Sequence, residues 1–254
     1  SRANSDPKLF AVLVALALAA GAQAASAQPL TDAELFGPEV TKTEPKKKPA
    51  RLNPPRPAHV AGAAVQVRRA PDPGAKVVRT FRDLRRDFRV RTIQVLGQKR
   101  GSDGELWYRV ALPGRPNGDS GFVPAERLDL RPPARFSIAI DRSARTLELR
   151  RGRTRVMRTR VAVGKPGAET PLGRFHLTAS FRPTAPILGS HALETSAYSR
   201  ISDWPGGGIV GIHGTPNPEL LGQAVSHGCV RMHNRDILRL RKLAEPGTPI
   251  RIVA

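Results

Sequence analysis

The sequence predicts a mainly β protein with two β regions and one short helix. Short runs rich in β-branched and aromatic residues, separated by Gly, Pro and Asp turn signals, fill residues 58–131. Longer alternating apolar and polar segments follow Arg131-Pro132-Pro133 and occupy residues 135–254. Helical spacing of apolar residues occurs once in this part of the chain, near its end. A chain of 254 residues is long enough for two such domains.

The first 57 residues predict a targeting segment and a linker. Basic Arg2 and Lys8 precede the apolar run Leu9–Ala22, and Ala25-Ser26-Ala27 provides a cleavage site, so residues 1–27 are expected to be a signal peptide. The run is shorter than the ~20 residues of a membrane-spanning helix. We therefore expect an extracytoplasmic protein that is secreted, periplasmic or associated with the cell wall, or membrane-anchored if the signal stays uncleaved. Residues 28–57 are rich in Pro and Lys and predict an extended linker.

The first β region is expected to be a small β domain. Its turn signals include Pro71-Asp72-Pro73-Gly74 and Gly101-Ser102-Asp103-Gly104. The runs between the turns predict strands at Ala64–Arg68, Phe88–Val95, Trp107–Ala111 and Gly121–Val123.

The second β region has longer strands and the one predicted helix. Asn234 is a good N-cap, Arg235–Leu243 has apolar residues at helical spacing, and Pro246-Gly247 ends the helix. Alternation or apolar runs predict strands at Phe136–Asp141, Thr146–Arg150, Val156–Val163, Gly173–Ser180, Ile209–His213 and Thr248–Val253.

The net charge of the chain gives little information about which class of partner it binds. Lys and Arg number 42 against 21 Asp and Glu, which gives a formal net charge of +21. Such a charge favours anionic surroundings. The arginines are spread along the chain and aromatic residues are few, so the pattern is not that of a nucleic-acid-binding module.

The stretch Ile212–Asn234 contains the candidate catalytic residues. It contains Cys229, the only cysteine of the chain, and three of the six histidines, His213, His227 and His233. A thiol becomes a nucleophile when a base takes its proton, and spacing alone allows either His213 or His227 to be that base. A glycine before the cysteine permits an unusual backbone angle, which could aim the N–H groups of residues 228 and 229 at a developing oxyanion.

Two other interpretations of this stretch stay open on the residues alone. His213, His227, Cys229 and His233 are a candidate zinc ligand set, although His227 and Cys229 are unusually close in sequence and a second cysteine is missing. The other interpretation is an inert buried cysteine among solvated histidines.

Longer motifs decide between these interpretations. S-H-G-C-V-R-M at Ser226–Met232, I-H-G-T-P-N-P at Ile212–Pro218 and V-G-K-P-G-A-E-T-P-L-G-R-F at Val163–Phe175 together resemble the catalytic domain of the L,D-transpeptidases. In the first β region, V-Q-V-R-R-A-P-D-P-G and E-L-W-Y-R-V-A-L resemble a bacterial SH3-type domain. The fold that the resemblance implies is a small SH3-like barrel followed by a β-rich L,D-transpeptidase domain with a short helix near the active site.

The resemblance also implies a role for each site residue. Cys229 would be the nucleophile and His213 its base, with the backbone carbonyl of Gly214 holding the imidazole. His227 and Ser226 would shape the site, and the N–H groups of Gly228 and Cys229 would form the oxyanion hole. Arg231 would bind a carboxylate of the substrate.

The implied substrates are peptidoglycan stem peptides, joined by 3→3 cross-links through a thioester on the cysteine. Water as acceptor would make the enzyme an L,D-carboxypeptidase, and the remaining alternative is a non-catalytic, zinc-binding cell-wall protein. The family implies carbapenem sensitivity, no cofactor and no resident metal; we expect a monomer and no nucleic-acid partner. Thr170-Pro171-Leu172-Gly173 and Phe181–Ser199 are expected to border the cleft; the latter segment, with His191, departs from the family pattern.

Overall fold

The computed structural model describes residues 55–202 and 207–254, which belong to one compact unit, Pro49–Ala254. The expected signal peptide, and the expected linker up to residue 54, lie outside the described residues. Arg56 and Pro57, expected in the linker, are in the first strand. Across the described ranges, we find no helix with the length and apolar character needed to cross a membrane.

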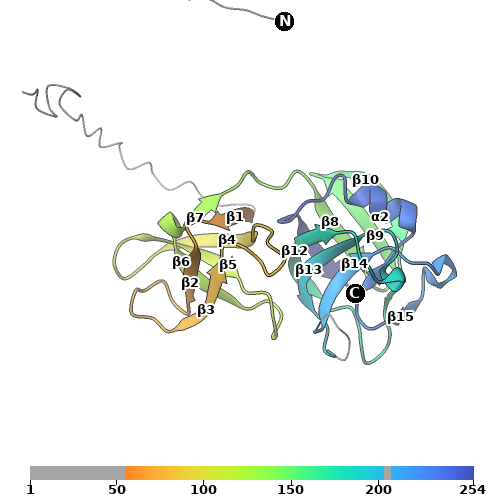
Figure 1. The fold of residues 1–254 in the computed structure, drawn as a ribbon, viewed down its shortest axis with the longest axis horizontal. Helices are drawn as coiled ribbons and strands as arrows, with labels where there is room; N and C mark the ends of the chain where they lie inside the picture. Colours follow the sequence, from red (N-terminus) through yellow and green to blue (C-terminus); the bar gives the residue numbers. More distant parts are fainter. Residues whose placement is uncertain (1–54, 203–206) are drawn as a thin grey trace, which may run out of the picture. The chain divides into compact units, whose positions relative to one another are not determined.

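The first β region forms one seven-stranded antiparallel sheet, in the order β3-β2-β6-β5-β4-β1-β7 (Figure 1). Side chains alternate across it, and one face buries a cluster of aliphatic residues and Phe81. The strands are β1 (Arg56–Val60), β2 (Ala64–Arg68), β3 (Val77–Arg82), β4 (Ile93–Arg100), β5 (Leu106–Ala111), β6 (Ser120–Pro124) and β7 (Leu128–Leu130), with a 3-10 turn η1 (Ala125–Arg127) before the last.

One predicted strand of this region is wrong. Phe88–Val95 was expected to be continuous, but β4 begins at Ile93. Phe88 has φ of 60° and is 86% exposed, at the tip of a tight turn in which the N–H of Arg85 donates to the carbonyl of Arg89. The apolar residues at 88 and 90 that suggested a strand therefore face outward from a loop.

The second β region forms an eight-stranded mixed sheet, in the order β10-β9-β8-β17-β12-β13-β14-β16, and a separate parallel pair, β11-β15. This bears out the mainly β class with one short helix among the described residues. The strands are β8 (Ser137–Asp141), β9 (Thr146–Arg151), β10 (Thr154–Arg160), β11 (Val163–Gly164), β12 (Gly173–Phe181), β13 (Ala192–Tyr198), β14 (Ile209–His213), β15 (Ala224–Ser226), β16 (Val230–Arg231) and β17 (Pro249–Val253), with 3-10 turns η2 (Pro186–Leu188) and η3 (Pro218–Leu220).

The helix α2 (Asn234–Leu240) packs Ile237 and Leu240 into the core of the second sheet (Figure 1). It begins one residue earlier than predicted, because His233 is the N-cap and its Nδ1 accepts from the N–H of Arg235 at 3.2 Å. The predicted cap, Asn234, has a different task. Its amide joins two loops beside the end of β14.

The strands β13, β14 and β16 lie side by side and present the key stretch. Ile212 pairs with Leu193 on one side and with Val230 on the other, and all three are buried in the core. Because side chains alternate, His213 and Gly211 face away from that core. The sheet thus holds the predicted base on a rigid strand, on the face opposite the hydrophobic core.

Candidate active site

His213, at the end of β14, is fixed by a backbone carbonyl. Its Nδ1 lies 2.6 Å from the carbonyl oxygen of Gly214, and only 3% of the residue is exposed. A carbonyl oxygen only accepts hydrogen bonds, so Nδ1 must carry the proton. In the neutral ring this leaves Nε2 with a lone pair, which is the form that a general base requires.

The structure brings Cys229 and His213 to one place, above Gly211. The N–H of Gly211 donates to the Cys229 sulfur at 3.4 Å. A Cβ placed on Gly211 would lie 3.8 Å from Cδ2 of His213 and 4.0 Å from Sγ of Cys229, so these two atoms are within about 8 Å of each other. A side chain at position 211 would therefore make ordinary van der Waals contacts with both the sulfur and the ring.

The turn before the cysteine is held by Ser226. Its buried hydroxyl donates to the carbonyl of Cys229 at 2.6 Å and accepts from the N–H of Gly228 at 3.1 Å. Gly228 has φ of 120°, a left-handed conformation that favours glycine. A Cβ at this position would also come within 2.9 Å of the hydroxyl of Ser199. Both the angle and the space thus demand glycine before Cys229.

The expected oxyanion hole needs one revision. The N–H of Gly228 already donates to Ser226, so it does not point at an incoming carbonyl. The described hydrogen bonds leave the N–H of Cys229 unengaged. The Ser226 hydroxyl accepts the hydrogen bond of the Gly228 N–H, as serine side chains often do with nearby backbone groups in tight turns.

Burial favours the uncharged forms of both the Cys229 thiol and the His213 ring. Desolvation lowers the pKa of His213 to about 4, the Gly214 carbonyl opposes that shift, and the positive charge of Arg231 adds to it. Desolvation also raises the pKa of the Cys229 thiol, against the N–H of Gly211 and the charge of Arg231. At neutral pH the two groups are therefore a thiol, whose sulfur lies 4.0 Å from the carbonyl oxygen of Ile209, and a neutral imidazole.

Arg231 lies next to this pair. It is paired in register with His213 across β16 and β14. Its Nε is buried and has no hydrogen-bond partner among the described residues. A buried donor without a partner is costly, so the group is available to an acceptor that enters the site.

The other two histidines do not join the cysteine and His213 in a metal site. His227 is exposed, and its backbone carbonyl accepts from the Ser199 hydroxyl at 2.8 Å. His233 caps the helix through its ring nitrogen. Over residues 55–202 and 207–254, His, Cys, Asp and Glu side chains nowhere gather in a group of three that could hold a metal ion. The geometry gives the zinc interpretation no ligand cluster.

Three supporting residues were missed as site residues in the sequence. Thr170 Oγ1 donates to the carbonyl of Gly228 at 2.8 Å and accepts from a backbone N–H in β11 at 2.9 Å. The Ser199 hydroxyl holds the carbonyl of residue 227. Asn234 accepts from the N–H of Ser190 at 2.9 Å and donates to the carbonyl of Thr215 at 3.0 Å. Thr170 is the first residue of the motif T-P-L-G, which was expected only to border the cleft.

His191, in the segment that departs from the family pattern, lies outside the catalytic pair. Its Nε2 is 2.8 Å from the hydroxyl of Ser180, and the residue is buried. Its backbone carbonyl accepts from the N–H of Gly214 at 3.1 Å. The residue therefore supports the loop that holds His213 through its main chain.

Comparison with known proteins finds a family model and relatives that match this chain. The family model of the L,D-transpeptidase catalytic domain (YkuD) matches residues 135–252. The chain is 32% identical to the protein YkuD of Bacillus subtilis, which is assigned to the L,D-transpeptidases, over 176 residues that cover 68% of this chain and 93% of that one. The corresponding protein of Bacillus licheniformis is 32% identical over 177 residues, with the same coverage.

A solved structure titled as the L,D-transpeptidase LdtMt1 in complex with imipenem is 18% identical and covers 58% of this chain and 90% of that chain, with a TM-score of 0.38. The family assignment rests on the sequence matches, which span almost the full length of the Bacillus proteins. On these sequence matches, the chain belongs to the L,D-transpeptidase family.

Proposed function

We propose that this protein is a peptidoglycan L,D-transpeptidase that forms 3→3 cross-links through a thioester on Cys229. The observation that carries the proposal is the pairing of the His213 Nδ1 with the Gly214 carbonyl. It leaves Nε2 as the basic nitrogen of a ring whose Cδ2 lies within about 8 Å of the Cys229 sulfur. No carboxylate is needed to orient the ring, because the carbonyl does so.

In the acylation step, the sulfur attacks the carbonyl that joins the third residue of a stem tetrapeptide to its terminal D-Ala. The thiol proton passes to Nε2 of His213, and the N–H of Cys229 stabilises the oxyanion. The C–N bond then breaks, and the imidazolium returns the proton to the leaving amine of D-Ala. The product of this step is a thioester on Cys229 and free D-Ala.

In the second step, a side-chain amine of another stem attacks the thioester. His213 takes a proton from that amine, the C–S bond breaks, and the thiolate regains a proton from the imidazolium. The result is an amide between two third residues, which is a 3→3 cross-link. Water in place of the amine would release a tripeptide and give the L,D-carboxypeptidase reaction.

Substrate recognition is proposed to use Arg231. Its Nε has no partner within the described residues, and a guanidinium pairs well with a carboxylate such as that of a stem peptide. A carbapenem offers a strained amide carbonyl to the same sulfur, so we propose that this class of inhibitor acylates Cys229. His227, exposed beside the turn, is proposed to shape the entrance.

The first sheet is proposed to be an SH3-type domain, on the resemblance of its sequence motifs. An extracytoplasmic location is proposed from the apolar run and cleavage motif of residues 1–27. Both suit an enzyme whose substrate is the cell wall.

The proposal is tested with purified protein and a disaccharide-tetrapeptide, followed by mass spectrometry of the products. We expect a dimer formed with loss of one D-Ala, and none with Cys229→Ala, while that variant keeps the circular dichroism spectrum of the parent. Tripeptide without dimer would identify a carboxypeptidase. Cross-linking by the Cys229→Ala variant would contradict the mechanism.

A further inference from the structure

Glu194 of β13 lies on the same face of the second sheet as the catalytic pair. In the register of β13 and β14, Glu194 is opposite Gly211 and Ala192 is opposite His213. Leu193 and Ile212, between them, point into the hydrophobic core. Glu194 is therefore one strand away from the glycine whose N–H contacts the Cys229 sulfur.

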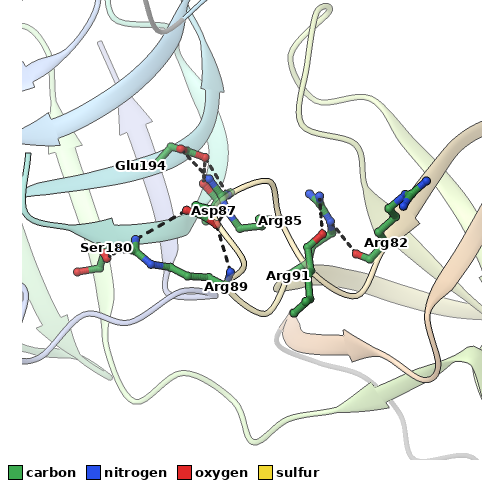
Figure 2. Close-up of polar contacts among 9 residues, drawn as sticks. Arg82, Arg85, Asp87, Arg89, Arg91, Ser180 and Glu194 are labelled. Atoms are coloured by element: carbon green, nitrogen blue, oxygen red, sulfur yellow. Dashed lines mark hydrogen bonds and ion pairs between the residues drawn. The ribbon is translucent and has the colours of Figure 1, made fainter.

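The carboxylate of Glu194 is bound by a residue of the first sheet's loop. Arg85 donates from Nη1 to Oε1 at 3.0 Å and from Nη2 to Oε2 at 2.9 Å, a two-pronged contact that Figure 2 shows. Thr178 of β12 donates to Oε1 at 2.7 Å. The two charged side chains are only 19% and 21% exposed. Such a partly buried, bidentate pair fixes geometry better than a surface pair.

The loop that presents Arg85 is itself well tied. It is the turn 83–91, where Leu84 and Val90 form a bridge and Asp87 lies 3.4 Å from Nε of Arg85. Arg89, on the same turn, donates to the carbonyl of Ser180 at 2.9 Å (Figure 2). The turn thus contacts two adjacent strands of the second sheet, β12 and β13, at defined atoms.

A second contact of the first sheet reaches the other end of β13. Asn117 both donates to the carbonyl of Tyr198 at 2.7 Å and accepts from its N–H at 2.9 Å. Arg115 donates to the carbonyls of Ser199 at 2.9 Å and Ile201 at 3.0 Å. Ser199 is the residue whose hydroxyl holds the turn before Cys229. Both ends of β13 are therefore held from the first sheet.

The geometry points to Arg85 as a positioning residue for the catalytic cysteine, acting through Glu194 and β13 on Gly211. The inference rests on the proposed function and extends it, since it makes the first sheet part of the catalytic apparatus. A sheet can be stabilised without a carboxylate at position 194. A carboxylate there requires a cation from outside the sheet, and its burial without that cation is unfavourable. The pair therefore makes the placement of β13 depend on the docked loop.

The test compares Arg85→Met, which keeps the length of the side chain and removes the charged fork, with Arg69→Met as a matched control. Arg69 pairs with Asp119 at 2.9 Å within the first sheet, with side chains 54% and 30% exposed. Two readouts are taken below the melting temperature of each variant. One is the pH profile of Cys229 alkylation by iodoacetamide, and the other is kcat and KM on the tetrapeptide.

For Arg85→Met we expect kcat to fall roughly tenfold with KM within about twofold, because misplacing a reacting group by a fraction of an ångström costs rate and not binding. We also expect slower alkylation and a profile displaced to higher pH, since Gly211 N–H would stabilise the thiolate less well. Arg69→Met should match the parent in both readouts. The inference is overturned if Arg85→Met and Arg69→Met have the same pH profile of alkylation and the same kcat.

Two further variants keep the test decisive if Arg85→Met folds poorly. Arg85→Lys keeps the charge and loses the fork, so we expect an intermediate kcat. The double variant Arg85→Glu with Glu194→Arg should recover part of the kcat lost by Arg85→Glu alone. If the double variant recovers no kcat and Arg85→Lys has the kcat of the parent, the inference is overturned. If the parent does not turn over the tetrapeptide, the proposed function fails, whereas the alkylation comparison still tests the positioning.

Discussion

The two sheets of this protein differ most in the polar groups that they bury. Among the described residues, the first sheet has Gln94 as its buried polar residue, and its amide has no hydrogen-bond partner. The second sheet buries many more, and several of them hold the turn before Cys229, including Thr170, Ser199 and Ser226. A buried polar group without a hydrogen bond is costly. The hydrogen-bonded buried groups therefore concentrate where the position of the backbone is most tightly determined, at the turn before Cys229.

The largest effect is expected at His213, a buried polar residue of the second sheet. His213→Gln removes the base and should lower kcat/KM about 10³-fold, within the range for general base catalysis. The parent needs a neutral imidazole and its pKa is lowered to about 4, so activity should fall only as the pH drops through about 4. A pH series of initial rates measures this. An acid limb near 6.5 would show that the ring is not desolvated in the working enzyme.

A smaller effect is expected at Thr170. Thr170→Val leaves the N–H of Gly164 and the carbonyl of Gly228 without their partner, which should cost about 2 kcal/mol of unfolding free energy and lower kcat roughly tenfold. The matched change in the first sheet is Gln94→Leu, which removes polar atoms that have no partner. It should leave kcat unchanged and stability within about 0.5 kcal/mol or higher.

Denaturant unfolding and steady-state kinetics measure both variants. A loss of kcat with Gln94→Leu as large as that with Thr170→Val would break the contrast between the sheets. In that case buried polarity would not distinguish the catalytic region from its neighbour.

The sequence predicted those parts of the site that depend on local pattern. The strand Ile209–His213 is confirmed, because a short apolar run ending at a histidine is readable without knowing its partners. The need for glycine at 228 also follows from the turn itself. The predicted carbonyl partner of His213 is adjacent in sequence, and the structure places it there.

The remaining features depend on which segments meet in space. Glu194 is paired in register with Gly211, 17 positions away, and the Ser199 hydroxyl donates to the carbonyl of His227, 28 positions away. Only the folded chain brings these residues together. Gly228 was expected to donate to an oxyanion, but a hydroxyl two residues before it takes the hydrogen bond. The turn at Phe88 was misread as strand because apolar composition alone does not show which side chains will be buried.

In the proposed mechanism the sulfur of Cys229 carries the acyl group. The most direct test is intact-mass spectrometry of the protein after incubation with a carbapenem, followed by peptide mapping. We expect one adduct per chain, located on the peptide that contains Cys229 and absent from Cys229→Ala. An unmodified parent protein, or an equal adduct on the Cys229→Ala variant, would contradict it.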